Sequence, residues 1–499
     1  MSGLGLGSER RVLDAPGGSR PGGADLISPD LLVDFGSTFT KLTAVAPGSG
    51  ALVGSAQHRT TVESDLMDGF GAALRQLQAA GVAAAGAGTV LGCSSAGGGL
   101  RVAIIGLERD LTAEAAKQVA LNSGGRIVTI VTRAASGSLV PQVARSAADL
   151  ILLVGGTDGG DEAFVVEAAR SLASGGVGPP VVFAGNTSAR AQVAAALDGG
   201  RVVWRSAPNV LPEIGRVEVD GVQSVIREAF IEHVIKGKRL SASDRFRQIV
   251  ALPTPDAVLE AVKLMAAGLA SPAGPEGLAG AGEILVVDVG GATTDVYSCL
   301  SAGNAASSRS GSLVPAAPVA RTVEADLGLR WSAESLVAAA RELRLVTGAE
   351  ADRLADAALQ RVADPGLVPQ TPDQAHDDLA LARLAVVAAI SRHAGRDRVV
   401  LTSAGADFRR TGRDVRGIRT VVLTGGVFRA NAGSDLHGFL NGAFDHFDRR
   451  RELVPAQVRV IVDSRYILAA AGLLSARSPE RARRLVLTTY GEFLRRTDD

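Results

Sequence analysis

Apolar residues form short strand-like runs and longer runs with helical spacing along most of the chain. The clearest strand-like runs are 31–33 and 284–287, and each is followed by an aspartate, Asp34 or Asp288. Glycine and other small residues come next, and then a second extended run. Short apolar runs bounded by turn residues are typical of buried strands. The pattern predicts two β-hairpins of one design, far apart in the chain, and therefore an internal duplication.

The two predicted turns carry residue types that bind a phosphate and its magnesium ion. Gly36, Gly290 and Gly291 let the chain turn and let a ligand approach the backbone. Backbone N–H groups and hydroxyls hold phosphate oxygens, and aspartates hold waters of a hydrated magnesium ion. The candidate hydroxyls are those of Ser37, Thr38, Thr293 and Thr294. A tight hairpin without a ligand explains either copy alone equally well, but two copies facing each other would clamp a polyphosphate.

Further runs extend both halves of this scaffold. Residues 51–57 predict a third antiparallel strand, and 65–80 predict a helix. Residues 419–424 predict a strand that ends at Gly425 and Gly426, where a flat ring or sugar can lie close to the backbone. Helices are expected near 332–346, 349–362 and 373–395, and the small residues of 463–474 predict a helix that another helix can approach closely.

Between residues 112 and 204, strand-like and helical patterns alternate. The alternation predicts a small parallel α/β domain, which we place at 112–215, inserted into the first half. Its glycine-rich segments 155–161 and 185–188 lie where a strand meets a helix. That position suits an anion or a small ligand, although ordinary helix caps by Asp161 and Ser188 explain it as well. The expected helices are 112–122, 139–148, 161–174 and 187–197, and the expected strands are 126–131, 149–154, 180–184 and 201–204.

The remaining segments complete the expected domain organisation. Residues 89–106 predict a strand, a glycine turn (97–99) and another strand, most simply a plain hairpin; 299–320 is expected to be an exposed loop. The expected domains are a disordered leader (1–30), part of a first lobe (31–111), the insertion (112–215), a largely helical return and linker (216–282), a second lobe (283–478) and a C-terminal amphipathic helix (479–499).

The amino-acid composition mainly excludes certain classes of protein. Hydrophobic residues make up 46% and charged residues 21% of the chain, which is typical of a soluble globular protein. A net charge of +0 and only 4% aromatic residues give no support for nucleic-acid binding. The two cysteines lie far apart and predict neither a disulfide framework nor a metal cluster, so we expect a cytoplasmic protein. No run is long and apolar enough to span a membrane.

Two histidines need separate comment. His376, with Asp377 and Asp378, resembles a metal-binding cluster, but acidic residues at a helix start favourably face the helix dipole, and we prefer that explanation. His393 lies near a helix end, where a cation is favoured, and we assign it no role.

These motifs, taken in order, resemble those of the actin, sugar-kinase and heat-shock-chaperone ATPase superfamily. Residues 34–41 are similar to its first phosphate motif, including a lysine, Lys41. Residues 288–296 are similar to the second phosphate motif and 423–429 to the adenosine motif, while 321–330 occupies the place of a segment near the ribose. The resemblance implies an α/β protein with a duplicated actin-like ATPase fold, in which two lobes surround a nucleotide cleft.

The resemblance also implies roles for individual residues, with ATP and Mg²⁺ as the ligands. Asp34 and Asp288 would orient waters on magnesium, and Asp295 would position the attacking water. Gly425 and Gly426 would border the adenosine, with Arg429 over the base. The β- and γ-phosphates would be held by Ser37, Thr38, Gly290, Gly291 and Thr293, and Lys41 would offset phosphate charge. Gly36 and Thr294 would also belong to the nucleotide-binding residues.

More closely, residues 30–478 resemble the MutL/GlmL proteins associated with adenosylcobalamin-dependent glutamate mutase, which are unrelated to the mismatch-repair protein called MutL. The motifs are 33–41, 93–100, 155–160, 288–296 and 423–427. The resemblance implies an ATP-binding accessory protein, a reactivating chaperone with weak Mg-dependent ATPase activity, whose partners are cobalamin-dependent mutase subunits. Two alternatives on the same scaffold are a small-molecule kinase and a filament-forming actin relative.

Overall fold

The computed structural model describes residues 28–83, 88–134, 138–235, 240–267, 282–307, 314–402, 405–431, 434–445, 447–448 and 451–494. The predicted leader therefore lies, except for residues 28–30, outside the described residues. The Gly- and Pro-rich linker into the second half, predicted at 268–282, also lies outside the described residues except for residue 282.

Two mixed sheets share one topology. In the first, the order β10-β4-β1-β2-β3 joins β1 (Asp30–Phe35), β2 (Phe39–Val45), β3 (Leu52–Arg59), β4 (Val90–Ser94) and β10 (Val250–Pro253). In the second, the order β13-β12-β11-β16-β17 joins β11 (Ile284–Val289), β12 (Thr294–Cys299), β13 (Val319–Glu324), β16 (Thr420–Thr424) and β17 (Arg459–Val462). Each sheet has three antiparallel strands followed by two parallel ones, with the first strand of each half in the centre. This repetition confirms the predicted duplicated actin-like fold.

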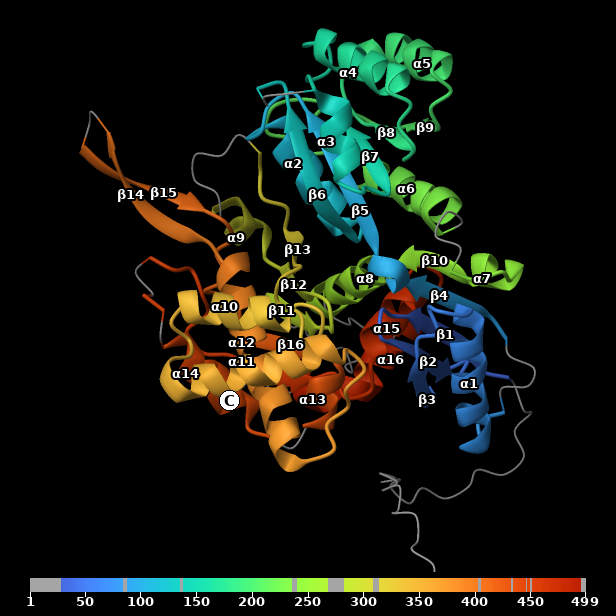
Figure 1. Ribbon diagram of the computed structural model, residues 1–499, viewed down its shortest axis with the longest axis vertical. Coiled ribbons are helices and arrows are strands. Elements are labelled where there is room, and N and C mark those ends of the chain that lie inside the picture. Colours follow the sequence, from blue (N-terminus) through green and yellow to red (C-terminus); the bar gives the residue numbers. More distant parts are fainter. Residues whose placement is uncertain are drawn as a thin grey trace, which may run out of the picture.

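The last helix of each sheet packs against the other sheet. Helix α8 (Thr254–Ala267) follows β10 and contacts β11 and β12 of the other sheet as well as β4 and β10 of its own, and α15 (Ile467–Ser475) follows β17 and contacts β1 and β4. The two helices pack tightly on each other, and α16 (Pro479–Leu494) covers them (Figure 1). The lobes are thus joined through one shared apolar core, which includes Leu32, Leu91, Val262, Ile467 and Leu485.

The close approach of these helices depends on Gly472. A Cβ at this position would overlap the carbonyl of Ala257 in α8. We therefore expect Gly472→Ala to lower the free energy of unfolding by about 1–3 kcal/mol through overpacking. Gly442→Ala in α14 (Leu436–Phe444) is the matched control, since a Cβ there meets nothing within 4 Å. Gly442→Ala should raise the free energy of unfolding by about 0.5–1 kcal/mol. Urea midpoints of Gly472→Ala and Gly442→Ala that shift in the same direction would contradict this packing model.

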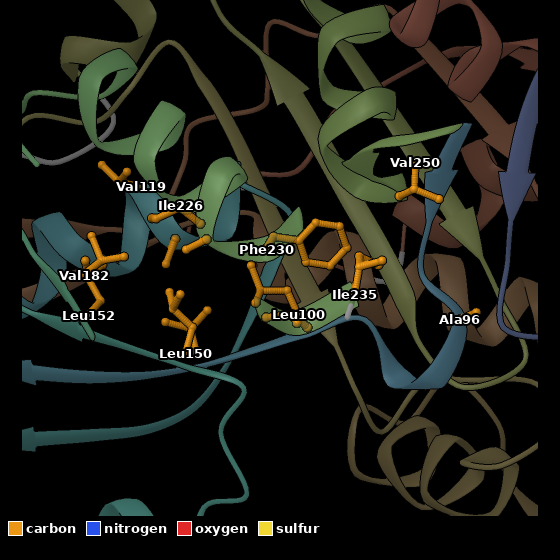
Figure 2. Packing of buried hydrophobic residues seen from close by; sticks show 14 of the residues in the cluster. Ala96, Leu100, Val119, Leu150, Leu152, Val182, Ile226, Phe230, Ile235 and Val250 are labelled. Carbon is orange, nitrogen blue, oxygen red and sulfur yellow. The ribbon is translucent and has the colours of Figure 1, made fainter. Parts of the chain in front are cut away.

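The inserted domain contains one parallel sheet in the order β6-β5-β7-β8-β9 (Figure 1, top). Helix α2 (Thr112–Asn122), at the bounds predicted for a helix, connects its first two strands. The strands are β5 (Leu100–Gly106), β6 (Gly125–Thr132), β7 (Leu150–Leu153), β8 (Val181–Phe183) and β9 (Trp204–Ser206), and the other helices include α3 (Leu139–Arg145), α4 (Ala163–Ser174), α5 (Arg190–Gly199) and α6 (Asp220–Ala229). Its core is continuous with that of the first lobe: Leu150 and Ile226 belong to one cluster with Val250 of β10 (Figure 2).

Several sequence predictions need correction. Residues 89–106 do not form a hairpin, because β4 and β5 belong to different sheets. Gly97, Gly98 and Gly99 all have positive φ (66°, 87° and 66°), which redirects the chain between the sheets. The parallel sheet therefore begins at β5, before residue 112. The largely helical return also contains a strand that the pattern did not reveal, β10, which has only four residues and lies between α7 (Asp244–Ile249) and α8.

The expected loop at 299–320 is also partly ordered structure. It contains α9 (Ala302–Ser307), a fully buried Val314 and the start of β13, while 308–313 lies outside the described residues. The expected helices of the second lobe are present as α10 (Ala333–Glu342), α11 (Gly348–Ala363) and α12 (Pro372–His393). The pattern gave no indication of the projecting hairpin of β14 (Arg396–Thr402) and β15 (Gly405–Thr411) (Figure 1). In the part of the chain that is described, no helix meets the length and hydropathy needed to cross a membrane.

His393, at the end of α12, is buried and neutral rather than a cation at a helix terminus. Its Nε2 lies 2.7 Å from Ser298 Oγ and its Nδ1 lies 3.0 Å from Thr322 Oγ1. Burial, assisted by Arg413, lowers the pKa of His393 to about 3. His393 thus links α12 to two strands of the second sheet as a hydrogen-bonding group without charge.

This burial predicts a pH dependence of stability. The folded-state pKa of His393 lies below the usual 6.5, so its contribution to stability is present above pH 6.5 and is lost as the pH falls toward 3. The slope should be as much as about 1.4 kcal/mol per pH unit in that window. His393→Gln should have a shallower loss of unfolding midpoint between pH 7 and pH 5 than the wild type. The exposed His437→Gln is the control, and identical pH slopes in all three proteins would contradict the prediction.

Candidate functional site

The two predicted hairpins have the same turn geometry. The Gly36 N–H donates to the Phe39 carbonyl at 3.2 Å, and the Gly290 N–H donates to the Thr293 carbonyl at 2.9 Å. Asp34 pairs in register with Lys41, and Asp288 pairs in register with Asp295. The same position thus carries a lysine in the first copy and an aspartate in the second.

The two turns meet at the boundary between the lobes. A Cβ built on Gly291 would lie only 3.2 Å from Thr38 Oγ1, so the tips of the turns are in contact. Lys41 Nζ lies 3.3 Å from Asp34 Oδ2, and its charge also interacts with Asp288 of the other lobe. The structure thus brings Asp34 and Asp288 to a common centre, as the sequence predicted.

Asp34 is held in place by neighbours from three elements. Thr254 Oγ1, at the start of α8, donates to its Oδ1 at 2.6 Å, and Cys93 Sγ on β4 lies 3.7 Å from the same oxygen. Lys41 binds the other carboxylate oxygen. Thr254 was not predicted as a site residue, because its segment reads as the interior of a helical region.

Electrostatics around Asp288 favour an incoming cation. Burial raises the pKa of Asp288 to about 7; Lys41 opposes this shift, whereas the carboxylates of Asp295 and Asp34 add to it. Burial disfavours the Lys41 ammonium, but Asp34 and Asp288 outweigh burial and raise the pKa of Lys41 above its usual value. A carboxylate crowded by other carboxylates gains from a divalent cation, and oxygen donors suit Mg²⁺. Asp34 and Asp288 therefore fit the magnesium role predicted for them.

Asp295 is the most constrained of the candidate carboxylates. Its Oδ1 accepts from Arg321 Nε at 2.9 Å and from Arg321 Nη2 at 2.5 Å, and its Oδ2 accepts from Thr293 Oγ1 at 3.1 Å. The Thr293 hydroxyl therefore lies at the turn, next to Asp295. The Thr294 hydroxyl does not face the turn, because it is fully buried and donates to the Leu327 carbonyl at 2.6 Å.

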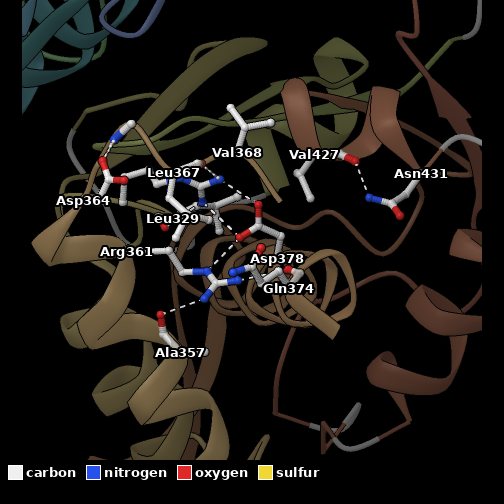
Figure 3. Close-up of polar contacts among 12 residues, drawn as sticks. Leu329, Ala357, Arg361, Asp364, Leu367, Val368, Gln374, Asp378, Val427 and Asn431 are labelled. Atoms are coloured by element: carbon white, nitrogen blue, oxygen red, sulfur yellow. Dashed lines mark hydrogen bonds and ion pairs between the residues drawn. The ribbon is translucent and has the colours of Figure 1, made fainter. Parts of the chain in front are cut away.

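A buried ion-pair cluster is connected to the second turn through a backbone hydrogen bond to Gly291. The Arg330 N–H donates to the Gly291 carbonyl at 2.8 Å, and Arg330 Nη2 binds Asp378 Oδ2 at 2.6 Å. The fully buried Arg361 binds Asp378 Oδ1 at 2.8 Å and also donates to the carbonyls of Ala357 and Gln374 (Figure 3). Asp378 therefore serves a buried arginine cluster. Asp378 is also buried, and its pairing with these arginines, rather than the helix dipole that we preferred, explains its position in α12.

The predicted adenosine residues lie around a tyrosine that the sequence did not single out. Gly425 has φ +130° and lies against the Val289 carbonyl, and a Cβ on Gly426 would approach Tyr466 Oη to 3.3 Å. The Tyr466 ring lies between Lys41, with Nζ 4.5 Å from its centroid, and Arg429, with Cζ 5.3 Å from it. Tyr466 has a left-handed backbone (φ 54°), which is uncommon for a non-glycine residue. That strain, at the start of α15, is the kind of signal only a structure provides.

The inserted domain has a separate cavity of about 430 Å³ at the carboxyl ends of β8 and β9. It is lined in part by Asp158, Thr187, Arg190 and Ser206. Asp158 accepts hydrogen bonds from the Thr187 N–H and from Asn209, which lower its pKa against the effect of burial. Asp161 caps α4 by accepting from the Phe164 N–H at 3.0 Å. The glycine-rich segments therefore build loops that shape a cavity, and capping explains part of their composition.

Comparison with known proteins gives a consistent result. A family model described as "MutL protein" matches residues 30–490. "Protein MutL" of Clostridium tetanomorphum is 36% identical over 465 residues, covering 91% of this chain and 98% of that protein. Among solved structures, a nucleotide-free acetone carboxylase matches with 14% identity and a TM-score of 0.38, covering 90% of this chain and 70% of that one. A glycerol dehydratase reactivase matches with 14% identity and a TM-score of 0.33, covering 89% and 99%. The two structural similarities are weak.

Proposed function

Because this chain belongs to the MutL protein family, we propose that it is an ATP-binding accessory protein that reactivates an adenosylcobalamin-dependent mutase of the glutamate mutase type. Membership of the family and the sequence motifs support the mutase as partner. The proposal that this chain binds ATP is supported by a different observation: the two matching acidic turns meet around Lys41. That observation carries the proposal.

In this proposal, the chain acts on ATP by positioning and electrostatics, without a covalent intermediate. Asp34 and Asp288 would hold a magnesium ion through its waters, which would supply positive charge beside the phosphates. The hydroxyls of Ser37, Thr38 and Thr293 and the N–H groups of the turns bind phosphate oxygens. Lys41 offsets phosphate charge from the first lobe. Asp295, oriented by Arg321, aligns the attacking water.

The tips of the two turns, at Thr38 and Gly291, lie close together, so a nucleotide bound between the lobes would act on both turns at once. The lobes are joined where α8 and α15 cross at Gly472, so a change at the turns becomes a rotation about this crossing. Rotation of rigid lobes about a packed hinge is a common way to convert ligand binding into movement of a distant surface. We propose that this rotation loosens the mutase around damaged cofactor, so that intact adenosylcobalamin can rebind.

The test is a reactivation assay with purified, inactivated mutase and fresh adenosylcobalamin. Wild-type protein with MgATP should restore mutase activity, whereas omission of ATP or the substitution Asp288→Ala should prevent recovery. Equal rescue by wild type and Asp288→Ala would reject an ATP-driven mechanism. ATP turnover that rises sharply with a single metabolite and yields its phosphorylated form would instead support a kinase, and pelleting with ATP would support a filament.

A further inference from the structure

The nucleotide turns and the inserted domain are linked by one buried arginine. Arg321 lies on β13 of the second lobe, is 4% exposed and binds Asp295 with Nε and Nη2. Its third nitrogen, Nη1, donates to the carbonyls of Leu121 at 3.1 Å and Gly125 at 2.9 Å. Both carbonyls belong to the inserted domain, at the end of α2 and the start of β6.

A second residue fixes the same contact. β13 is the edge strand of its sheet, and Asn122 occupies part of its free edge. The Asn122 amide donates to the Val319 carbonyl at 3.0 Å and accepts from the Arg321 N–H at 3.1 Å. Asn122 thus replaces the backbone of a neighbouring strand, which is one way a protein covers an exposed edge.

The position of this contact in the fold makes it sensitive to lobe rotation. The inserted domain shares a hydrophobic core with the first lobe (Figure 2), whereas Arg321 and Asp295 belong to the second lobe. Val314, shortly before β13 in the chain, also belongs to this core. A rotation between the lobes must therefore act on this contact.

We infer that Arg321 is a positioning residue that couples the nucleotide site to the inserted domain, which makes this domain the part of the molecule that responds to ATP. This inference rests on the proposed function. The arginine fork is planar, so a shift of the Asp295 carboxylate reorients the whole guanidinium group. Reorientation misaligns Nη1 with the Leu121 and Gly125 carbonyls, and hydrogen bonds weaken steeply with angle. The end of α2 thus reports the state of the phosphate turn.

Backbone hydrogen–deuterium exchange of the full chain, with and without MgATP, tests this coupling. In the wild type, MgATP should change exchange in the 288–295 hairpin and also, by about fivefold or more, in the last turn of α2 and the start of β6. Asn122→Ala keeps the Arg321–Asp295 pair, and Arg321→Lys keeps the charge without the fork. Both variants should retain the response of the hairpin and lose the response of α2.

Arg392→Ala is the matched control, because Arg392 binds Glu324 at the other end of β13 at 2.9 Å. This variant should respond like the wild type. Two outcomes would overturn the coupling and leave the proposed function intact. In the first, the wild-type hairpin responds to MgATP while α2 does not; in the second, the α2 response survives both Asn122→Ala and Arg321→Lys. If MgATP changes neither region and no ATP binding is measured, the proposed function fails and the coupling with it.

Discussion

Replacing Asp288 with asparagine is expected to lower the rate of Mg-dependent ATP hydrolysis by about 100-fold or more. Asparagine keeps the size of the side chain but removes the negative charge that holds the waters of magnesium. Phosphate release from MgATP by purified protein measures the effect. MgATP should also raise the melting temperature of the wild type but not that of Asp288→Asn, because binding to the folded state is what stabilises it.

The same substitution should not destabilise the protein. Burial raises the pKa of Asp288 to about 7, so its ionised form is a cost to the folded state above that pH. Without nucleotide, Asp288→Asn should therefore unfold at the same or a higher urea concentration than the wild type at pH 8. Asp352→Asn is the control, since Asp352 has 78% of its side chain exposed on α11. Unchanged hydrolysis in Asp288→Asn would remove the central support for an ATPase.

Asp378→Ala is expected to cost about 3–5 kcal/mol of folding free energy, because it leaves two buried guanidinium groups without their carboxylate. Arg361 is fully buried and Arg330 is largely so, and both bind Asp378. Domains are typically stable by only about 5–15 kcal/mol, so much of the second lobe's stability would be lost. Urea unfolding followed by circular dichroism measures this loss.

Two comparisons separate a stranded charge from a simple cavity. Asp373→Ala lies in the first turn of the same helix, α12, but is exposed, and should change stability by less than about 1 kcal/mol. Adding Arg361→Met to Asp378→Ala removes one of the unpaired charges and should recover part of the loss. If the double variant is less stable than Asp378→Ala alone, packing rather than charge explains the effect.

The sequence predicted those parts of the fold whose signals are local. The aspartate, glycine and hydroxyl pattern of each hairpin is contiguous in the chain, so both hairpins and the duplication could be inferred. Most strands of the insertion are short apolar runs between helices, so a parallel α/β unit could be inferred, but not the strand order or the inclusion of β5. By contrast, β10 is a four-residue strand that exists because β4 pairs with it, and no local pattern marks it.

Site residues that act through distant partners were not predictable. Thr254 lies 220 positions from Asp34, and Arg321 is separated from its inserted-domain acceptors by a similar length of chain. Tyr466 contacts Lys41 of the other lobe through its ring face, without any motif of its own. These contacts follow from the way the two lobes close on each other, which depends on the whole core.

The packing of each lobe's last helices against the other lobe constrains how the protein folds during synthesis. The first sheet is complete after β10, but its inner face is covered by α15 and α16, and Arg481 of α16 binds Asp30 of β1. The apolar inner face of the first sheet is therefore not fully covered until α15 and α16 have been synthesised. Until then, apolar surface of the nascent chain is exposed to aggregation, and termination near residue 460 would leave the core shared by the two lobes without these helices.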